Sequence, residues 1–220
     1  MTSDGGIFDP FGTLGQALWI CGGQWAGKST VSRLLARRHG ITVYHYDFHD
    51  ARAHQDRRVA HRVGNGLPTA DPDPDTVWVD TTPGRMAADT IAGFPARFEW
   101  ALDDLRALVS GRPILAEGWG LRPELVAPLL DSPRRMIVMV PTDDFREHQL
   151  RVLPRAAAVE HRVSDPERAR RNRIERDRLV AEDAVRVAKR LGVRVLEVDG
   201  SRDAEAVADV VAGHFGPYLA

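Results

Sequence analysis

The residues with the clearest chemical meaning form one run near the N-terminus, Gly22-Gly23-Gln24-Trp25-Ala26-Gly27-Lys28-Ser29, followed by Thr30. The run matches G-x-x-x-x-G-K-[ST], a pattern expected by chance on the order of once in a thousand such chains. Backbone N–H groups of such a loop turn inward, and the following helix adds partial positive charge, so residues 22–30 are predicted to bind a polyphosphate. The Lys28 ammonium can follow the β- and γ-phosphates, and the Ser29 hydroxyl can bind Mg²⁺. Trp25 is bulky for this loop and either covers a phosphate or packs outward.

The elements that position this loop alternate along the chain. Short apolar or β-branched runs predict five strands, and amphipathic or capped segments between them predict helices. This alternation is typical of an α/β fold with a parallel sheet covered on both faces. The five predicted strands cover residues 17–21, 41–46, 113–117, 135–140 and 193–198.

The remaining segments complete the predicted organisation. Residues 1–15 are expected to be a loose, flexible leader, and residues 16–220 a single domain. Residues 48–110 are predicted to be a helical insertion between the second and third strands. Within it, one helix is expected to start at Thr82-Pro83 and a further one to run from about Pro95 to Val109. Ser201 is expected to cap the last helix.

Composition excludes several classes of protein. The 220 residues are 43% hydrophobic and 28% charged, which is ordinary for a globular protein. Thirty basic and 31 acidic residues give a net charge of -1, so a nucleic-acid or membrane binder is not indicated. Cys21 is the single cysteine, and the N-terminus has no basic region typical of a secretory signal, so a cytoplasmic location is expected.

The chain resembles the P-loop kinases that include nucleoside monophosphate kinases, shikimate kinase and chloramphenicol phosphotransferase. The resemblance rests on the loop at residues 22–29, acidic residues at the ends of strands two and three, and an Arg-rich segment after strand four. It is most similar to a bacterial branch marked by Glu117-Gly118-Trp119-Gly120-Leu121-Arg122-Pro123, Pro141-Thr142 and Ser164-Asp165-Pro166-Glu167-Arg168. The resemblance implies a P-loop NTPase three-layer sandwich with strand order 2-3-1-4-5, and ATP and Mg²⁺ as cofactors.

Two carboxylates are candidates for the chemistry. In kinases of this kind an Asp at the position of Asp47 accepts the proton of the acceptor hydroxyl or helps to hold Mg²⁺ through water. The alternative is that Asp47 caps the helix that follows, with Asp50 as the replacement candidate. Glu117 resembles a Walker B carboxylate, which could orient a Mg²⁺-bound water near Ser29 or contact the acceptor. Its alternative is a cap of the following turn.

The Arg-rich segment at residues 151–178 has nine arginines and five acids, a net charge of 9 − 5 = +4. The resemblance implies that it is a lid, whose arginines stabilise the spreading charge of the transferring phosphoryl group and exclude water. Arg155, Arg168 and Arg171 are the predicted phosphate-facing set, with Arg155 on the nucleotide and the other two taking part in catalysis. A solvated, salt-bridged helix face is the alternative.

Four histidines, at positions 45, 49, 54 and 61, raise the question of a metal site. Near them in the sequence there is no carboxylate or cysteine at a spacing typical of metal ligands, so we interpret them as half-exposed residues beside an acceptor cleft.

Three functions are compatible with these residues. An ATP-dependent, Mg²⁺-dependent kinase of a small-molecule acceptor accounts for the loop, Asp47, the insertion and the Arg-rich segment together. A nucleotide-binding regulatory P-loop protein with slow or no hydrolysis would need the loop but not Asp47. A P-loop protein that acts on nucleic acid is disfavoured by the balanced charge. The acceptor, and the choice between ATP and GTP, are not specified by any residue pattern in the sequence.

Overall fold

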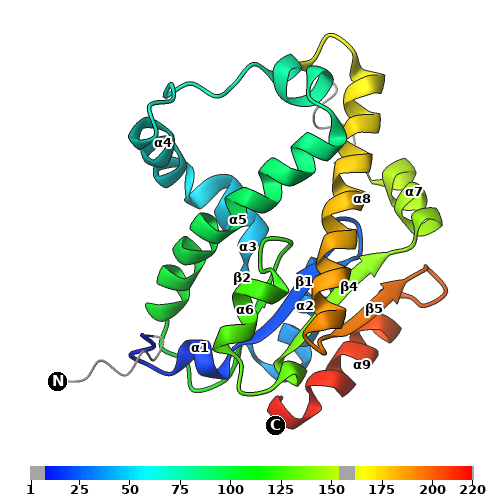
Figure 1. The fold of residues 1–220 in the computed structure, drawn as a ribbon. Helices are drawn as coiled ribbons and strands as arrows, with labels where there is room; N and C mark the ends of the chain where they lie inside the picture. Colours follow the sequence, from blue (N-terminus) through cyan, green and yellow to red (C-terminus); the bar gives the residue numbers. More distant parts are fainter. Residues whose placement is uncertain (1–7, 154–161, 220) are drawn as a thin grey trace.

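The computed structural model describes residues 8–153 and 162–219. Its centre is a five-stranded, all-parallel sheet in the order β2-β3-β1-β4-β5 (Figure 1), the order predicted from the sequence. Each predicted strand is present, and no strand end differs from its predicted position by more than one residue. The strands are β1 Leu18–Gly22, β2 Thr42–His45, β3 Ile114–Glu117, β4 Met136–Pro141 and β5 Arg194–Val198.

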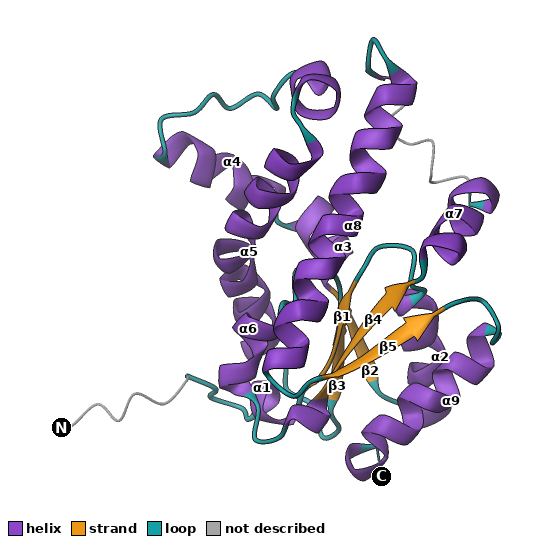
Figure 2. Cartoon of the chain, turned by 45° about the vertical axis from the view of Figure 1, so that its right-hand side comes forward, coloured by secondary structure: helices purple, strands orange, loops and turns teal. Residues whose placement is uncertain are grey.

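Helices cover both faces of the sheet, which gives three layers (Figure 2). Successive strand residues point to opposite faces, so Leu18 and Ile20 of β1 contact one helical layer while Trp19 and Cys21 contact the other. One layer is formed by α2 Lys28–His39 and α9 Ala204–Phe215. The other is formed by α1 Thr13–Gln16, α5 Pro83–Arg106, α6 Pro123–Val126 and α8 Pro166–Arg190. The helix α7 Asp143–Val152 follows β4.

The predicted insertion between β2 and β3 is helical. It contains α3 Tyr46–Phe48, a π-helical turn η1 His49–Ala53, α4 Gln55–Gly64, a second π-helical turn η2 Thr76–Asp80, and α5. The helix α5 packs along α8 (Figure 1). The turn η2 packs against the N-terminal half of α8 through Asn172, whose amide donates to backbone carbonyls of η2. The insertion and α8 therefore form one side of the molecule above the sheet.

Three sequence expectations are corrected. The two helices predicted from Pro83 and Pro95 are one continuous helix, because Pro95 removes only one backbone hydrogen bond while the apolar face formed by Phe94 and Phe98 continues past it. The last helix is capped by Asp203, whose carboxylate accepts from the N–H of Ala206, and not by Ser201. The leader predicted to be loose up to residue 15 is ordered at α1, where Leu14 is buried.

Short 3₁₀ turns occur at Ala127–Leu129, Pro133–Arg135 and Gly216–Tyr218. Among the described residues, no helix combines the length and the apolar character that crossing a bilayer requires.

Candidate active site

The loop between β1 and α2 has the backbone shape that its glycines allow. Gly22 has φ +124°, and a Cβ there would lie 1.9 Å from the carbonyl oxygen of Met139. The N–H of Gly23 donates to that same oxygen at 2.9 Å, which holds the loop against β4. Gly27, with φ +79°, precedes the first residue of α2. Side chains at Gly22 and Gly27 would strain this path, so the pattern is required by the shape of the loop.

Lys28 points into the loop and not into solvent. Its side chain is buried, and Nζ donates to the carbonyl oxygen of Gly23 at 2.8 Å. A cavity of about 320 Å³, within the size range of ligand sites, opens beside it. The cavity is lined by Gln24, Trp25, Gly27, Lys28, Ser29, Thr30, Arg33, Asp47, Gln149 and Leu153. The structure thus brings Asp47 to the predicted phosphate loop.

The cavity also contains residues that the sequence did not single out. Arg33 lies one turn along α2 from Ser29, and Gln149 and Leu153 come from α7 and the residue after it. The spacing of four residues from Ser29 along a predicted helix could have indicated that Arg33 faces the phosphate loop. The approach of α7 to the loop depends on the tertiary structure and has no local signal in the sequence. A larger cavity of about 690 Å³ lies between α7, α8 and β5, and no residue of the phosphate loop lines it.

Asp47 lies in α3, two residues after the C-terminal end of β2. Its Oδ1 accepts a hydrogen bond from the backbone N–H of Trp119 at 3.1 Å. Burial raises the pKa of Asp47 to about 6, with the Lys28 ammonium opposing the shift and the Glu117 carboxylate adding to it. A carboxylate with this pKa is ionised at neutral pH and is a better proton acceptor than an exposed one.

Glu117, at the end of β3, is almost fully buried. Its Oε1 lies 2.7 Å from Nδ1 of His45, the neighbouring residue on β2. Burial alone would raise the pKa of Glu117, but His45, Lys28 and the Ser29 hydroxyl outweigh it and hold the pKa below its ordinary value. The same contact raises the pKa of His45. The role of His45 was missed because the pairing depends on strand register.

These groups suit a nucleotide with Mg²⁺. Oxygen ligands are the ones that Mg²⁺ prefers, and Ser29, Asp47 and Glu117 supply hydroxyl and carboxylate oxygens around Lys28. The Oε2 atom of Glu117 is buried and makes no hydrogen bond of ordinary geometry, so it has capacity left for an ion or an ion-bound water. The inward N–H groups of the loop and Lys28 suit the phosphates.

Trp25 has a backbone conformation that is unusual for its type. Its φ is +71°, in the left-handed region, and its indole packs with Leu150, Leu153 and Ile174. It also contacts the buried carboxylate of Asp177 on α8. Trp25 therefore joins the loop to the C-terminal end of α7 and to the N-terminal half of α8 while forming part of the cavity wall.

Two of the three predicted arginines, Arg168 and Arg171, lie apart from the loop. Arg168 and Arg171 are exposed on α8, and Arg171 pairs with Glu167 at 3.7 Å. Neither lines the loop cavity, and their role on the phosphates stays a prediction. Arg155 lies outside the described residues. A different arginine of the segment, Arg176, is stacked near two indoles, Trp78 and Trp119, with its guanidinium carbon 5.2 and 5.1 Å from their ring centres.

The wall next to Asp47 is formed by Tyr46 and two glycines. A Cβ at Gly118 would lie 2.8 Å from Oδ1 of Asp47, and one at Gly120 would lie 2.3 Å from the Tyr46 ring. Asp50 does not replace Asp47, because it is buried in an ion pair with Arg97 at 2.9 Å. Glycine at both positions lets the loop after β3 approach closely enough to hold Asp47.

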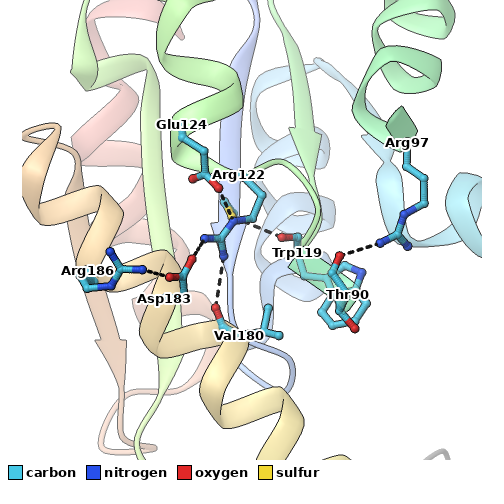
Figure 3. A network of polar contacts seen from close by, with 9 residues as sticks. Thr90, Arg97, Trp119, Arg122, Glu124, Val180, Asp183 and Arg186 are labelled. Atoms are coloured by element: carbon cyan, nitrogen blue, oxygen red, sulfur yellow. Dashed lines mark hydrogen bonds and ion pairs between the residues drawn. The ribbon is translucent and has the colours of Figure 1, made fainter. Parts of the chain in front are cut away.

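That loop is fastened to α8 by a buried arginine (Figure 3). Arg122 is fully buried; it pairs with Asp183, donates to the carbonyl oxygen of Val180 at 3.2 Å, and contacts Glu124 at 3.0 Å. Its position two residues after Gly120 fixes the path of the chain between Glu117 and α6.

The strand order, with a G-x-x-x-x-G-K-S loop between β1 and α2, defines the class: the chain has the P-loop NTPase fold, a three-layer α/β sandwich.

Comparison with solved structures finds two kinds of small-molecule kinase. A gluconokinase from Sinorhizobium meliloti 1021 has a TM-score of 0.43 and 14% identity, covering 93% of each chain. A shikimate kinase from Acinetobacter baumannii in complex with shikimate has a TM-score of 0.42 and 17% identity, covering 95% of this chain and 98% of that one. The shikimate kinase from Aquifex aeolicus has a TM-score of 0.35 and 16% identity, covering 91% and 97%. No protein-family model and no curated protein matches the chain.

Proposed function

We propose that the protein is an ATP-dependent, Mg²⁺-dependent phosphotransferase that acts on a hydroxyl group of a small molecule. One observation carries the proposal: the cavity beside the phosphate loop has Asp47 in its wall, a half-buried carboxylate with a pKa of about 6. A nucleotide-binding regulatory protein needs the loop and Lys28 but has no use for a proton acceptor at that place.

The residues divide the chemistry between them. The loop N–H groups and Lys28 would hold the phosphates, and Ser29 with Glu117 would hold Mg²⁺, with Asp47 helping only through a bound water; the ion would neutralise charge on the phosphate oxygens. Asp47 takes the proton of the acceptor hydroxyl while the oxygen of that hydroxyl forms a bond to the γ-phosphorus. The bond from that phosphorus to the β–γ bridging oxygen breaks, and ADP leaves with the electron pair. The N–H of Trp119 keeps the Asp47 carboxylate in place throughout.

The location that suits these roles is the cytoplasm, where ATP is available. The helical insertion at residues 48–110 is the segment that we expect to bind the acceptor, and the segment 151–178 the one that covers the phosphates.

The test is a screen of pooled metabolites with Mg²⁺ and ATP, with mass detection of an added phosphoryl group. Once an acceptor is found, Asp47→Asn should lower kcat by about 10²–10⁴-fold, the usual contribution of a positioned base. Nucleotide binding, measured as a shift in the thermal midpoint, should remain. Asp144→Asn, on an exposed part of α7, is the matched control and should leave both unchanged.

The outcomes separate the alternatives. Unchanged turnover in Asp47→Asn would remove Asp47 from the mechanism. Nucleotide binding without transfer to any acceptor would favour the regulatory P-loop protein.

A further inference from the structure

A second cluster of chemistry-bearing residues lies where the insertion leaves β2. The π-helical turn η1 places His49 and His54 on one side of the chain, because the N–H of His54 donates to the carbonyl oxygen of His49, five residues back, at 2.8 Å. In an α-helix, residues five apart point about 140° away from each other. A π-turn is a rare element that often marks a functional site. Here it turns two imidazoles toward the same carboxylate, Asp104 of α5.

We propose that His49, His54 and Asp104 bind a divalent transition-metal ion of the Zn²⁺ class. The ligand atoms are Nδ1 of His49, Nε2 of His54 and Oδ2 of Asp104, and all three lie within 4.8 Å of one another. It is the single such group of three that residues 8–153 and 162–219 contain. The proposal does not depend on the proposed function.

The distances suit a tetrahedral ion. Two ligand atoms about 2.0 Å from zinc stand roughly 3.3 Å apart. Oδ2 of Asp104 lies 3.3 Å from Nδ1 of His49 and 2.7 Å from Nε2 of His54. An opening of the second distance, with the two imidazole nitrogens, which lie within 4.8 Å of each other, brought to the same separation, would place both imidazoles and the carboxylate around one centre.

Without an ion, Oδ2 of Asp104 faces more hydrogen-bond donors than it has lone pairs to accept from. The Tyr44 hydroxyl donates to this oxygen at 2.8 Å, in addition to the two imidazoles. A carboxylate oxygen has two lone pairs, so one of three donors is left poorly satisfied. With an ion bound, one lone pair goes to the metal and the other accepts from Tyr44, while the imidazoles turn their own lone pairs to the metal. Tyr44 then orients the carboxylate, as outer partners of metal ligands do.

The surroundings leave room for this arrangement. Arg57 contacts the other oxygen, Oδ1, at 3.9 Å, and so does not occupy the lone pairs of Oδ2. The Tyr44 ring stacks on His49 at 4.3 Å, and Trp100 packs edge-on against His54 at 5.9 Å, which holds both imidazoles. The His49 and Asp104 side chains are 33% and 24% exposed, which gives an ion a way in and a place for a water ligand.

The choice of metal follows from the ligands. Two imidazoles favour Zn²⁺ over Mg²⁺, which takes oxygen ligands such as those around Lys28. The two sites should therefore select different ions. An ion here would fasten the first turn of the insertion to α5.

The experiment measures metal binding by the full chain after removal of metals with a chelator. Zinc chloride is added, the protein is passed through a desalting column, and bound zinc is counted by mass spectrometry; a calorimetric titration with a competing chelator gives the affinity. Wild type should retain about one equivalent in the presence of excess Mg²⁺, and Co²⁺ in place of Zn²⁺ should give the visible absorption of a tetrahedral site.

The variants locate the ion. His49→Ala and Asp104→Asn should weaken zinc binding by at least about tenfold, since even loss of an outer partner costs that much. His61→Ala removes an exposed histidine of the adjacent α4, and Asp47→Asn removes the carboxylate in the active-site cavity; both should bind zinc like wild type. His49 is half-exposed, so its replacement should leave the fold intact, which circular dichroism checks.

Two results would overturn the proposal. Wild type that retains no zinc shows that the cluster is a hydrogen-bonded contact only. Equal affinity in wild type, His49→Ala and Asp104→Asn shows that zinc binds elsewhere.

Discussion

At the scale of single residues, the protonation of Asp47 controls the proposed reaction. Burial lifts the pKa of this carboxyl to about 6, above the value of an exposed aspartate. The base is active when ionised, so kcat/KM should be constant above about pH 7 and fall tenfold per pH unit well below pH 6. A pH profile of kcat/KM with the identified acceptor measures this. A profile that stays flat down to pH 5 would contradict the role of Asp47.

His45 and Glu117 predict a second pH effect, on stability. The contact raises the pKa of His45, so the folded state holds this proton more tightly than the unfolded one. The stabilisation is fully present below the ordinary histidine pKa of about 6.5 and is lost as the pH rises through the raised value. His45→Asn should therefore cost more stability at pH 6 than at pH 9, measured by urea unfolding. His148→Asn, on an exposed part of α7, should show no such difference.

The candidate site shows which residue roles can be predicted from sequence. The loop and Asp47 were predicted because short-range patterns carry them: a motif of eight residues and a strand followed by a carboxylate. The His45–Glu117 pair depends on the register of β2 against β3, and the His49–His54–Asp104 cluster joins residues 50 positions apart through a π-turn. No local pattern encodes either contact, so the partners of these three histidines cannot be predicted from the sequence.

At the scale of elements, the phosphate loop carries a side chain where its backbone favours glycine. Trp25 has φ +71°, which costs a non-glycine residue about 1–2 kcal/mol, and its packing with Leu150 of α7, with Leu153 and with Ile174 of α8 offsets that cost. Trp25→Ala should lose about 3–5 kcal/mol, as large-to-small changes do. Trp25→Gly should be about 1 kcal/mol more stable than Trp25→Ala, because glycine removes the backbone strain.

The control for that comparison is the next residue. Ala26 is buried and has no left-handed φ, so Ala26→Gly should be less stable than wild type, the opposite order of alanine and glycine. Urea unfolding of the three variants gives the ranking. If Trp25→Ala is as stable as Trp25→Gly, the loop does not hold a left-handed residue at this position.

Prediction of the elements succeeded at the five strands and at the helix start Thr82-Pro83, and it was wrong at Pro95 and at the cap of the last helix. Five strands follow from short apolar runs, and all five are present. The sequence predicts a helix start at Pro95, but the buried face of α5 continues through it, so tertiary packing outweighs the lost hydrogen bond. Asp203 and Ser201 are both acceptable cap residues, and the turn before α9 selects Asp203.

At the scale of the whole molecule, α8 connects the sheet, the insertion and the loop after β3. It packs against α5, η2, α6, β4 and β5, a set of partners that no sequence pattern predicted. The capping residue Asp165 and Pro166 fixed where the helix begins, but its partners depend on how the insertion folds back over the sheet. Because one helix holds three parts of the molecule, a change in its buried contacts should affect global stability.

Arg122 gives the sharpest test of that connection. It is fully buried, with Asp183 of α8 as one acidic partner and the more exposed Glu124 as the other (Figure 3). Asp183→Asn should cost about 2–3 kcal/mol, because a buried charge loses its main counter-charge, whereas Glu124→Gln should cost less than about 1 kcal/mol.

The double variant should lose more than the sum of the two, because Arg122 is then left uncompensated inside the protein, a situation that costs about 3–5 kcal/mol. Urea unfolding of the two single variants and the double variant measures the coupling. A loss from Asp183→Asn that is no larger than the loss from Glu124→Gln would show that the Arg122–Asp183 pair does not hold α8 to the loop after β3, and additive losses would show that the two carboxylates act independently. A coupled loss would show that the Arg122 guanidinium links the loop after β3, which carries the Trp119 N–H, to α8, which packs on the insertion.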